Sequence, residues 1–453
     1  MRTAPTLDEL ADDLEAGRTS AAKLVEQCLA RIDDAGGEGA RVFMHVMRKE
    51  ATAAAEGIDK LRAAGAGASR YAGIPISIKD LFDIKGQVTR GGSKVLDDRP
   101  AAMADAPAVA RLRGAGFIVM GRTNMTEFAF SGIGINPHYG TPKNAWDRAS
   151  GGRVPGGSSS GAAVSVADGM AHMGLGTDTG GSCRIPAAFN GIVGYKPTAS
   201  RVPTAGALPL STTLDSVGPL ARSVACCAAA DAVLAGQPHR KLVPADLSRL
   251  RIAVPQNFVL ADMEEKVAQD FERALSALSK AGAKVVKLAM PAFDDIPRIN
   301  SKAGFSAAEA LAWHKDLIAA RGPQYDQRVL SRIKRGHEQS AIDYIALFGE
   351  RARLIAAVYA GMADFDVMAL PTTPIVAPKI ADLAADDAFA KANMLALRNP
   401  SVINMIDGCS ISLPMHATGE APTGLMLAAV GGQDAALFSF AAGIEKLLGG
   451  GSP

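Results

Sequence analysis

The sequence lacks several features that would place it in a specialised class of protein. Its 453 residues include only five cysteines, and no two of them have C-x-x-C spacing. An odd number without such pairs argues against a disulfide framework and suits a reducing compartment. Positive and negative side chains nearly cancel, with a formal net charge of +2. The chain therefore has no long-range field to draw nucleic acid or a membrane surface. The short basic cluster at 332–335 is expected to be a solvated helix face.

Other absences narrow the possibilities further. No apolar run reaches the roughly 18 residues that a membrane-spanning helix needs, and the acidic N-terminus, MRTAPTLDELADDLEAG, does not resemble a secretory signal. A cytoplasmic location is the prediction. The sequence contains no G-K-[ST] phosphate loop, and no spacing of His, Cys and carboxylates indicates a metal site. We expect neither a metal nor a cofactor.

What the chain does contain is a stretch dense in Gly and Ser, from Pro155 to Pro197. Two Gly-Gly-Ser triplets in it place Ser158 and Ser182 directly after glycine pairs. Glycine lets the backbone approach a ligand closely. A serine at the end of such a pair can present its hydroxyl beside free backbone N–H groups, which is the arrangement that acyl transfer needs.

A serine nucleophile also needs a base, and the sequence offers a lysine for this role. Ile74, Ile76 and Ile78 alternate along a predicted strand that leads into Lys79. Lysine acts as a base only if desolvation or a nearby positive charge lowers its pKa, and the apolar flank of Lys79 can desolvate it. Without further information, a charge on an edge strand is an equally good interpretation. His172 is the one histidine within the motif segments, and we predict that it is a packed core residue.

These segments resemble the amidase signature family. The resemblance rests on GGSSSG at 156–161, GTDTGGSCRIPAAFNGIVGYKPT at 176–198 and GIPISIKD at 73–80, which occur in the family's order. It implies a Ser-Ser-Lys arrangement in which Ser182 attacks the amide carbonyl. Ser158 then relays the proton to Lys79, the base.

The resemblance also implies the surroundings of the nucleophile. The oxyanion would be held by backbone N–H groups of the nucleophile loop, and the peptide bond between Gly157 and Ser158 would be cis. The Ser158 hydroxyl would reach both Lys79 and Ser182. An ion pair between Asp178 and Arg184 is predicted to brace the loop. The residues of the predicted oxyanion hole are Thr179, Gly180, Gly181 and Ser182.

Rival motifs point elsewhere. Residues 157–161 fit the G-x-S-x-G pattern of α/β-hydrolases with Ser159 as nucleophile, but that pattern requires a strand just before the serine, and residues 153–156 make a poor one. Cys183 lies beside Ser182 and is interpreted as a small buried residue rather than a reactive thiol. The S-x-x-K matches at 20–23 and 331–334 lack their partner motifs and sit on predicted amphipathic helices.

The alternation of strands with helices predicts an α/β fold, and the resemblance implies a large mixed sheet covered by helices on both faces, with N-terminal helices wrapping the body. We interpret residues 1–453 as a single domain. Its expected parts are an N-terminal helical segment (1–65), a catalytic core (71–235), a surface connection (236–250) and a second half that completes the sheet and pocket (251–453). Substrate specificity is expected from the 126–145 loop and the helical 300–362 region.

The sequence thus predicts an enzyme that hydrolyses a linear amide to an acid and an amine or ammonia. Two alternatives stay open at this point. One is the glutamine-hydrolysing subunit of a tRNA-dependent amidotransferase, which would work with partner subunits. The other is a non-catalytic binding protein on an amidase scaffold. The predicted partner is a small-molecule amide, with no nucleic acid and no membrane, and a homodimer is left open.

Overall fold

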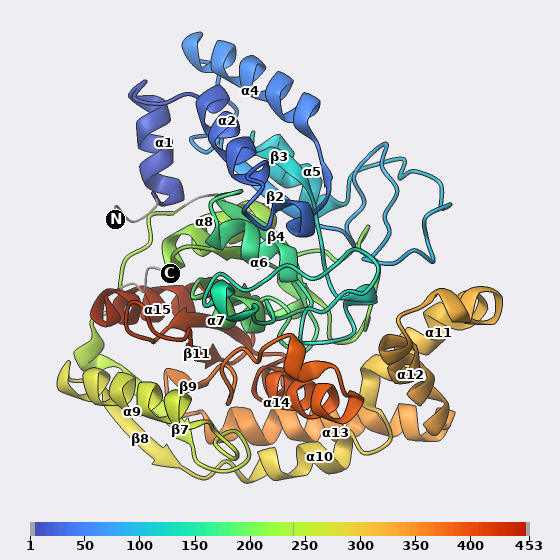
Figure 1. The fold of residues 1–453 in the computed structure, drawn as a ribbon. Coiled ribbons are helices and arrows are strands. Elements are labelled where there is room, and N and C mark those ends of the chain that lie inside the picture. Colours follow the sequence, from blue (N-terminus) through green and yellow to red (C-terminus); the bar gives the residue numbers. More distant parts are fainter. Residues whose placement is uncertain (1–4, 239, 450–453) are drawn as a thin grey trace.

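A single mixed sheet of eleven strands forms the centre of the computed structural model, which describes residues 5–238 and 240–449 (Figure 1). The strand order is β1-β3-β2-β4-β6-β5-β10-β11-β9-β7-β8. The strands are β1 Phe43–Val46, β2 Pro75–Lys79, β3 Ile118–Thr123, β4 Met173–Asp178, β5 Val193–Lys196, β6 Ser216–Ala221, β7 Arg251–Pro255, β8 Lys284–Leu288, β9 Val367–Pro371, β10 Cys409–Pro414 and β11 Gly424–Ala429.

Helices begin where the sequence places capping residues and apolar periodicity. In the first helix, the Thr6 hydroxyl accepts from the Glu9 N–H, and the Glu9 carboxylate accepts in return from the Thr6 N–H, so the predicted capping box is present. The α-helices are α1 Leu7–Glu15, α2 Ala21–Ile32, α3 Gly39–Val42, α4 Arg48–Ala63, α5 Pro107–Gly114, α6 Ser160–Ala167, α7 Arg184–Asn190, α8 Val224–Leu234, α9 Glu265–Lys280, α10 Ile296–Ile299, α11 Gly304–Arg321, α12 Gln327–Lys334, α13 Ala341–Gly361, α14 Asp386–Met405 and α15 Asp434–Leu448.

The helices form two layers, one on each face of the sheet. Helices α1, α5, α8, α15 and α9 contact one another or neighbouring strands in succession along one face. On the other face the succession runs through α4, α2, α3, α6, α7, α14 and α13. Figure 1 shows the N-terminal helices at one end of the body and α11 and α12 projecting from its side. The predicted α/β architecture is confirmed.

The sheet brings two motif segments to one edge. Strands β2 and β4 are parallel neighbours, and the carboxyl ends of parallel strands meet on the same side of a sheet. Lys79 is the last residue of β2, and Thr177 and Asp178 are the last two of β4. The loop after β4 therefore starts beside Lys79, and it leads into α7.

No helix in the described part of the chain is long and apolar enough to cross a membrane.

Candidate active site

Lys79 is fully buried at the end of an interior strand. Its Nζ lies 2.7 Å from Ser158 Oγ and 2.8 Å from Thr177 Oγ1, and its side chain is 0% exposed. Burial lowers the pKa of Lys79 to about 8, because the charged ammonium loses its hydration, although the nearby Cys183 and acidic groups act in the other direction. Strand β2 lies between β3 and β4, so the interpretation as an edge-strand charge is wrong.

The two serines come together as the glycine pairs allow. The peptide bond between Gly157 and Ser158 is cis, as predicted. The Ser159 N–H donates to the Ser182 carbonyl at 3.3 Å, which joins the two serine loops. Of the two contacts predicted for the Ser158 hydroxyl, the one to Lys79 is present. Among the hydrogen bonds of the described residues there is none between the hydroxyls of Ser158 and Ser182.

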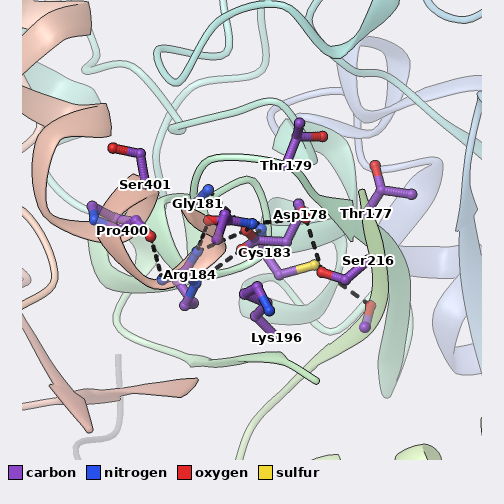
Figure 2. A network of polar contacts seen from close by, with 12 residues as sticks. Thr177, Asp178, Thr179, Gly181, Cys183, Arg184, Lys196, Ser216, Pro400 and Ser401 are labelled. Atoms are coloured by element: carbon purple, nitrogen blue, oxygen red, sulfur yellow. Dashed lines mark hydrogen bonds and ion pairs between the residues drawn. The ribbon is translucent and has the colours of Figure 1, made fainter. Parts of the chain in front are cut away.

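The predicted ion pair between Asp178 and Arg184 is present and completely buried. Arg184 Nη2 lies 2.7 Å from Asp178 Oδ1, and both side chains are 0% exposed. The same carboxylate accepts from the backbone N–H groups of Gly181 at 2.8 Å and Cys183 at 3.0 Å (Figure 2). Burial would raise the pKa of Asp178, but the Arg184 charge and these donors outweigh it and hold the pKa below its usual range. Asp178 thus shapes the loop on both sides of Ser182.

Helix α14 supports this ion pair from outside the motif. Arg184 Nη1 donates to the Pro400 carbonyl at 2.9 Å, and Arg184 Nη2 donates to Asn404 Oδ1 at 2.7 Å (Figure 2). Asn404 Nδ2 in turn donates to Asp178 Oδ1 at 3.0 Å. A buried charged pair contributes stability only when its remaining hydrogen-bonding groups are satisfied, and α14 supplies those partners.

The backbone amides of the nucleophile loop differ in what they contact. The Gly181 N–H donates to Asp178 and is therefore occupied. The N–H groups of Thr179, Gly180 and Ser182 donate to no other group in the described part of the chain. The Thr179 hydroxyl donates to Asp215 Oδ1 at 2.5 Å. Burial raises the pKa of Asp215 to about 6, against the opposing effect of its hydrogen bonds.

A cavity of about 1140 Å³ opens above Ser182. Thr179, Gly180 and Ser182 form part of its wall. The remaining wall comes from the 129–137 loop, from residues 296–335 and from α14. The prediction that the 126–145 loop and the 300–362 region contribute to the pocket is confirmed, whereas the contribution of α14 was not predicted.

Arg332 lines this cavity, so the expectation that the basic cluster is a solvated helix face is wrong for this residue. Its guanidinium lies 5.1 Å from the centroid of the Phe130 ring. Burial lowers the pKa of Arg332 to about 10, with a smaller effect from the Arg335 charge. The neighbouring Arg328 and Arg335 pair with Asp386 and Glu338 respectively. Arg332 has no hydrogen bond or ion pair within the described residues.

The remaining expectations concern residues near the motifs. Ser159 is buried and its hydroxyl donates to the Thr177 carbonyl at 3.3 Å; no strand precedes it, apart from one isolated bridge at Arg153. His172 is partly buried, and desolvation lowers its pKa to about 4. Cys183 is buried, and burial raises the pKa of its thiol. Within residues 5–238 and 240–449, no cluster of His, Cys and carboxylates could hold a metal ion.

The chain is similar to known proteins along almost its whole length. The family model described as Amidase matches residues 23–438. A 2-amino-5-chloromuconic acid deaminase from Comamonas testosteroni is 36% identical over 405 residues, which cover 88% of this chain and 87% of the deaminase. One chain of the glutamyl-tRNA(Gln) amidotransferase from Anaeromyxobacter sp. (strain K) is 32% identical over 489 residues, 98% of this chain and 96% of that one. A crystal structure of an amidase superposes with a TM-score of 0.87 at 30% identity, covering 98% of this chain and 99% of that one.

Proposed function

This chain belongs to the amidase signature family, an enzyme family that hydrolyses C–N bonds, and from that premise we propose that it cleaves a small-molecule amide through an acyl-enzyme on Ser182. The observation that carries the proposal is the 2.7 Å contact between Lys79 Nζ and Ser158 Oγ beneath a cavity that Ser182 lines. Turnover of amides by the purified chain, measured as released amine or ammonia, tests it.

In the proposed reaction the Ser182 hydroxyl attacks the amide carbonyl carbon. Its proton passes to Ser158 while the Ser158 proton passes to the neutral amine of Lys79. The tetrahedral intermediate then collapses: the C–N bond breaks, and the proton returns from Lys79 through Ser158 to the departing nitrogen. Water attacks the acyl-Ser182 ester by the same proton path and releases the acid. The pKa of about 8 supports this role, because a sizeable fraction of Lys79 is neutral near physiological pH.

Backbone amides would stabilise the oxyanion of that intermediate. The N–H groups of Thr179, Gly180 and Ser182 are unengaged within the described residues and adjoin the cavity, which supports their assignment. Because the Gly181 N–H donates to Asp178, its proposed part is to hold the loop in shape rather than to contact the oxyanion. Preorganised donors of this kind need no rearrangement as charge develops.

The free guanidinium of Arg332, which has no partner among the described residues, indicates what kind of amide the pocket accepts. A cation without a partner in a largely apolar cavity is unfavourable until an anion binds there. Its planar donors match a carboxylate. We therefore propose a substrate that carries a carboxylate in addition to the amide. The resemblance to an enzyme named for a muconic acid, itself a carboxylate compound, is consistent with this class.

Replacing Arg332 with Met tests this substrate class. We expect the KM for carboxylate-bearing amides to rise by about 10–100-fold, the order of a lost charge-assisted hydrogen bond. The KM for neutral amides of similar size should change little. The two substrate series measured side by side with the wild type supply the control. An equal loss for both series would contradict carboxylate recognition.

The second candidate is the amide-hydrolysing component of an amidotransferase, and the relative from Anaeromyxobacter, which aligns with 98% of this chain, favours it. Such a component would release ammonia for transfer by partner proteins. Glutamine carries both an amide and a carboxylate, so it belongs in the assay. Hydrolysis of other amides by the chain alone, faster than glutamine, supports the stand-alone amidase. A chain that hydrolyses only glutamine, and only with partner subunits, is the second candidate.

Extended dialysis against EDTA should leave amide hydrolysis unchanged. The reason is that Lys79, Ser158 and Ser182 supply the base, relay and nucleophile, and backbone amides supply the oxyanion contacts. The measurement is the initial rate before and after chelation, with re-addition of zinc as a check. Activity that disappears with EDTA and returns with zinc would overturn the proposed mechanism.

A further inference from the structure

Glu127 is a buried carboxylate close to the cavity that the reaction above does not use. It lies in the short turn after β3 and is 0% exposed. From its contacts we infer that Glu127 is a positioning residue: it fixes the start of α12 and so sets where Arg332 meets the substrate. This inference rests on the proposed role of Arg332 as the ligand of a substrate carboxylate.

Three donors from three separate segments converge on Glu127. The Ser93 hydroxyl lies 2.6 Å from Oε1, and His138 Nε2 lies 2.8 Å from the same oxygen. The backbone N–H of Asp326 donates to Oε2 at 2.8 Å. Ser93 and His138 belong to the catalytic half of the chain, whereas Asp326 begins the helical wall of the cavity. One carboxylate therefore bridges the two sides.

The Asp326 contact acts directly on α12. Asp326 is the N-cap of this helix, and its side chain accepts from the Arg328 N–H at 2.9 Å. Glu127 is the acceptor of the Asp326 N–H. Arg332 is in the second turn of α12. A shift at the cap moves the whole of a helix this short, because it is a rigid hydrogen-bonded unit.

Aromatic packing joins the same two segments independently of Glu127. The Phe128 ring lies 4.3 Å from the His314 ring and 5.4 Å from the Tyr325 ring, measured between centroids. The His314 Nδ1 and the Tyr325 hydroxyl are 3.0 Å apart. Because these contacts do not involve the carboxylate, the enzyme should still fold when the Glu127 contact to Asp326 is lost. The carboxylate then adjusts position rather than holding the fold together.

Proline at position 326 removes this one donor with little other change to the backbone. Asp326 has φ −57°, which proline adopts without strain. Tyr325 has φ −70° and ψ 153°, the extended conformation favoured before proline. Asp326→Ala is the matched reference: it loses the same side-chain cap but keeps the N–H. The comparison of Asp326→Pro with Asp326→Ala therefore isolates the hydrogen bond to Glu127.

For a carboxylate-bearing amide, we expect the KM of Asp326→Pro to exceed that of Asp326→Ala about tenfold, with kcat within about twofold, as for a lost bond to a charged group. For a neutral amide the two variants should match. Glu127→Gln, which replaces one carboxylate oxygen with a donor, should show the same selective rise in KM. In the Arg332→Met background these effects should vanish, because both residues act on the same contact. The rate of fluorophosphonate labelling at Ser182 should stay at the wild-type value in all of them.

Hydrogen–deuterium exchange keeps the test independent of turnover. In Glu127→Gln we expect faster exchange of the backbone amides at 326–330 than in the wild type, with the 314–321 amides unchanged. Equal KM values for Asp326→Pro and Asp326→Ala, or unchanged exchange at 326–330, would overturn the inference. An equal loss on neutral and anionic amides would also overturn it, as a general structural role. If the wild type hydrolyses no amide, the proposed function fails, while the exchange measurement still decides whether Glu127 holds α12.

Discussion

Replacing Ser182 with Ala is expected to abolish both amide turnover and covalent labelling by a fluorophosphonate. Ser182 lies in the cavity wall, close to backbone amides of its own loop that adjoin the cavity, and this loop is shaped by the Asp178 carboxylate. Removal of a nucleophile that works as part of a unit lowers kcat by about a million-fold. The measurements are product formation over long incubation and intact-mass analysis after labelling.

Ser159 is the matched control, because it is a neighbouring serine that fits the rival hydrolase pattern. Its hydroxyl is directed to the Thr177 carbonyl, at 3.3 Å, and its side chain is buried. We expect Ser159→Ala to keep its activity within about tenfold, the effect of losing one neutral hydrogen bond nearby. Label recovered on Ser159 instead of Ser182 would reverse the assignment.

The parts of the fold that could be predicted from sequence are those with clear local periodicity. The strand ending at Lys79, the β-α-β unit of β7, α9 and β8, and the last helix α15 all occur where the pattern placed them. In α9 the buried stripe includes Val267, Phe271 and Leu278, as its spacing indicated. Local signals are enough where one face of an element is apolar and the other polar.

Elements buried on all sides were not predicted. Strands β4 and β6 are buried at every position, so they show no alternation, and their Gly and Pro residues disguise them as loops. Helix α14 has buried polar residues such as Asn393 and Asn404 and contains Pro400, which hides its apolar spacing. Yet α14 supplies partners to the Asp178–Arg184 pair and lines the cavity. Tertiary contacts rather than local propensity place these segments.

The same reason separates the motif residues from the rest of the site. Lys79, Ser158 and Ser182 stand in recognisable motifs. Arg332 and Glu127 do not, since what distinguishes them is the partner that each lacks or has in space. In sequence Arg332 is one of three arginines in or beside a short helix, and only the structure shows that the other two are paired with carboxylates.

Replacing Lys79 with Met should leave a folded protein that has lost activity by several orders of magnitude, since it removes the proposed proton acceptor from a coupled unit. Met fills a similar volume and needs no hydration. In the wild type, kcat/KM should rise about tenfold per pH unit up to roughly pH 8 and then level off, because only neutral Lys79 accepts a proton. A pH series of initial rates, from about pH 5.5 to 10, measures this limb.

The stability of the two proteins provides the control for this interpretation. The folded-state pKa of Lys79, about 8, lies below its ordinary value because burial disfavours the charge. Below pH 8 the wild type therefore carries the cost of a buried ammonium, and its stability rises with pH between 8 and the ordinary lysine pKa of about 10.4. Lys79→Met should be at least as stable as the wild type at about pH 7 and lack this rise. A Lys79→Met variant that folds and turns over amides at near the wild-type rate would rule out Lys79 as the base.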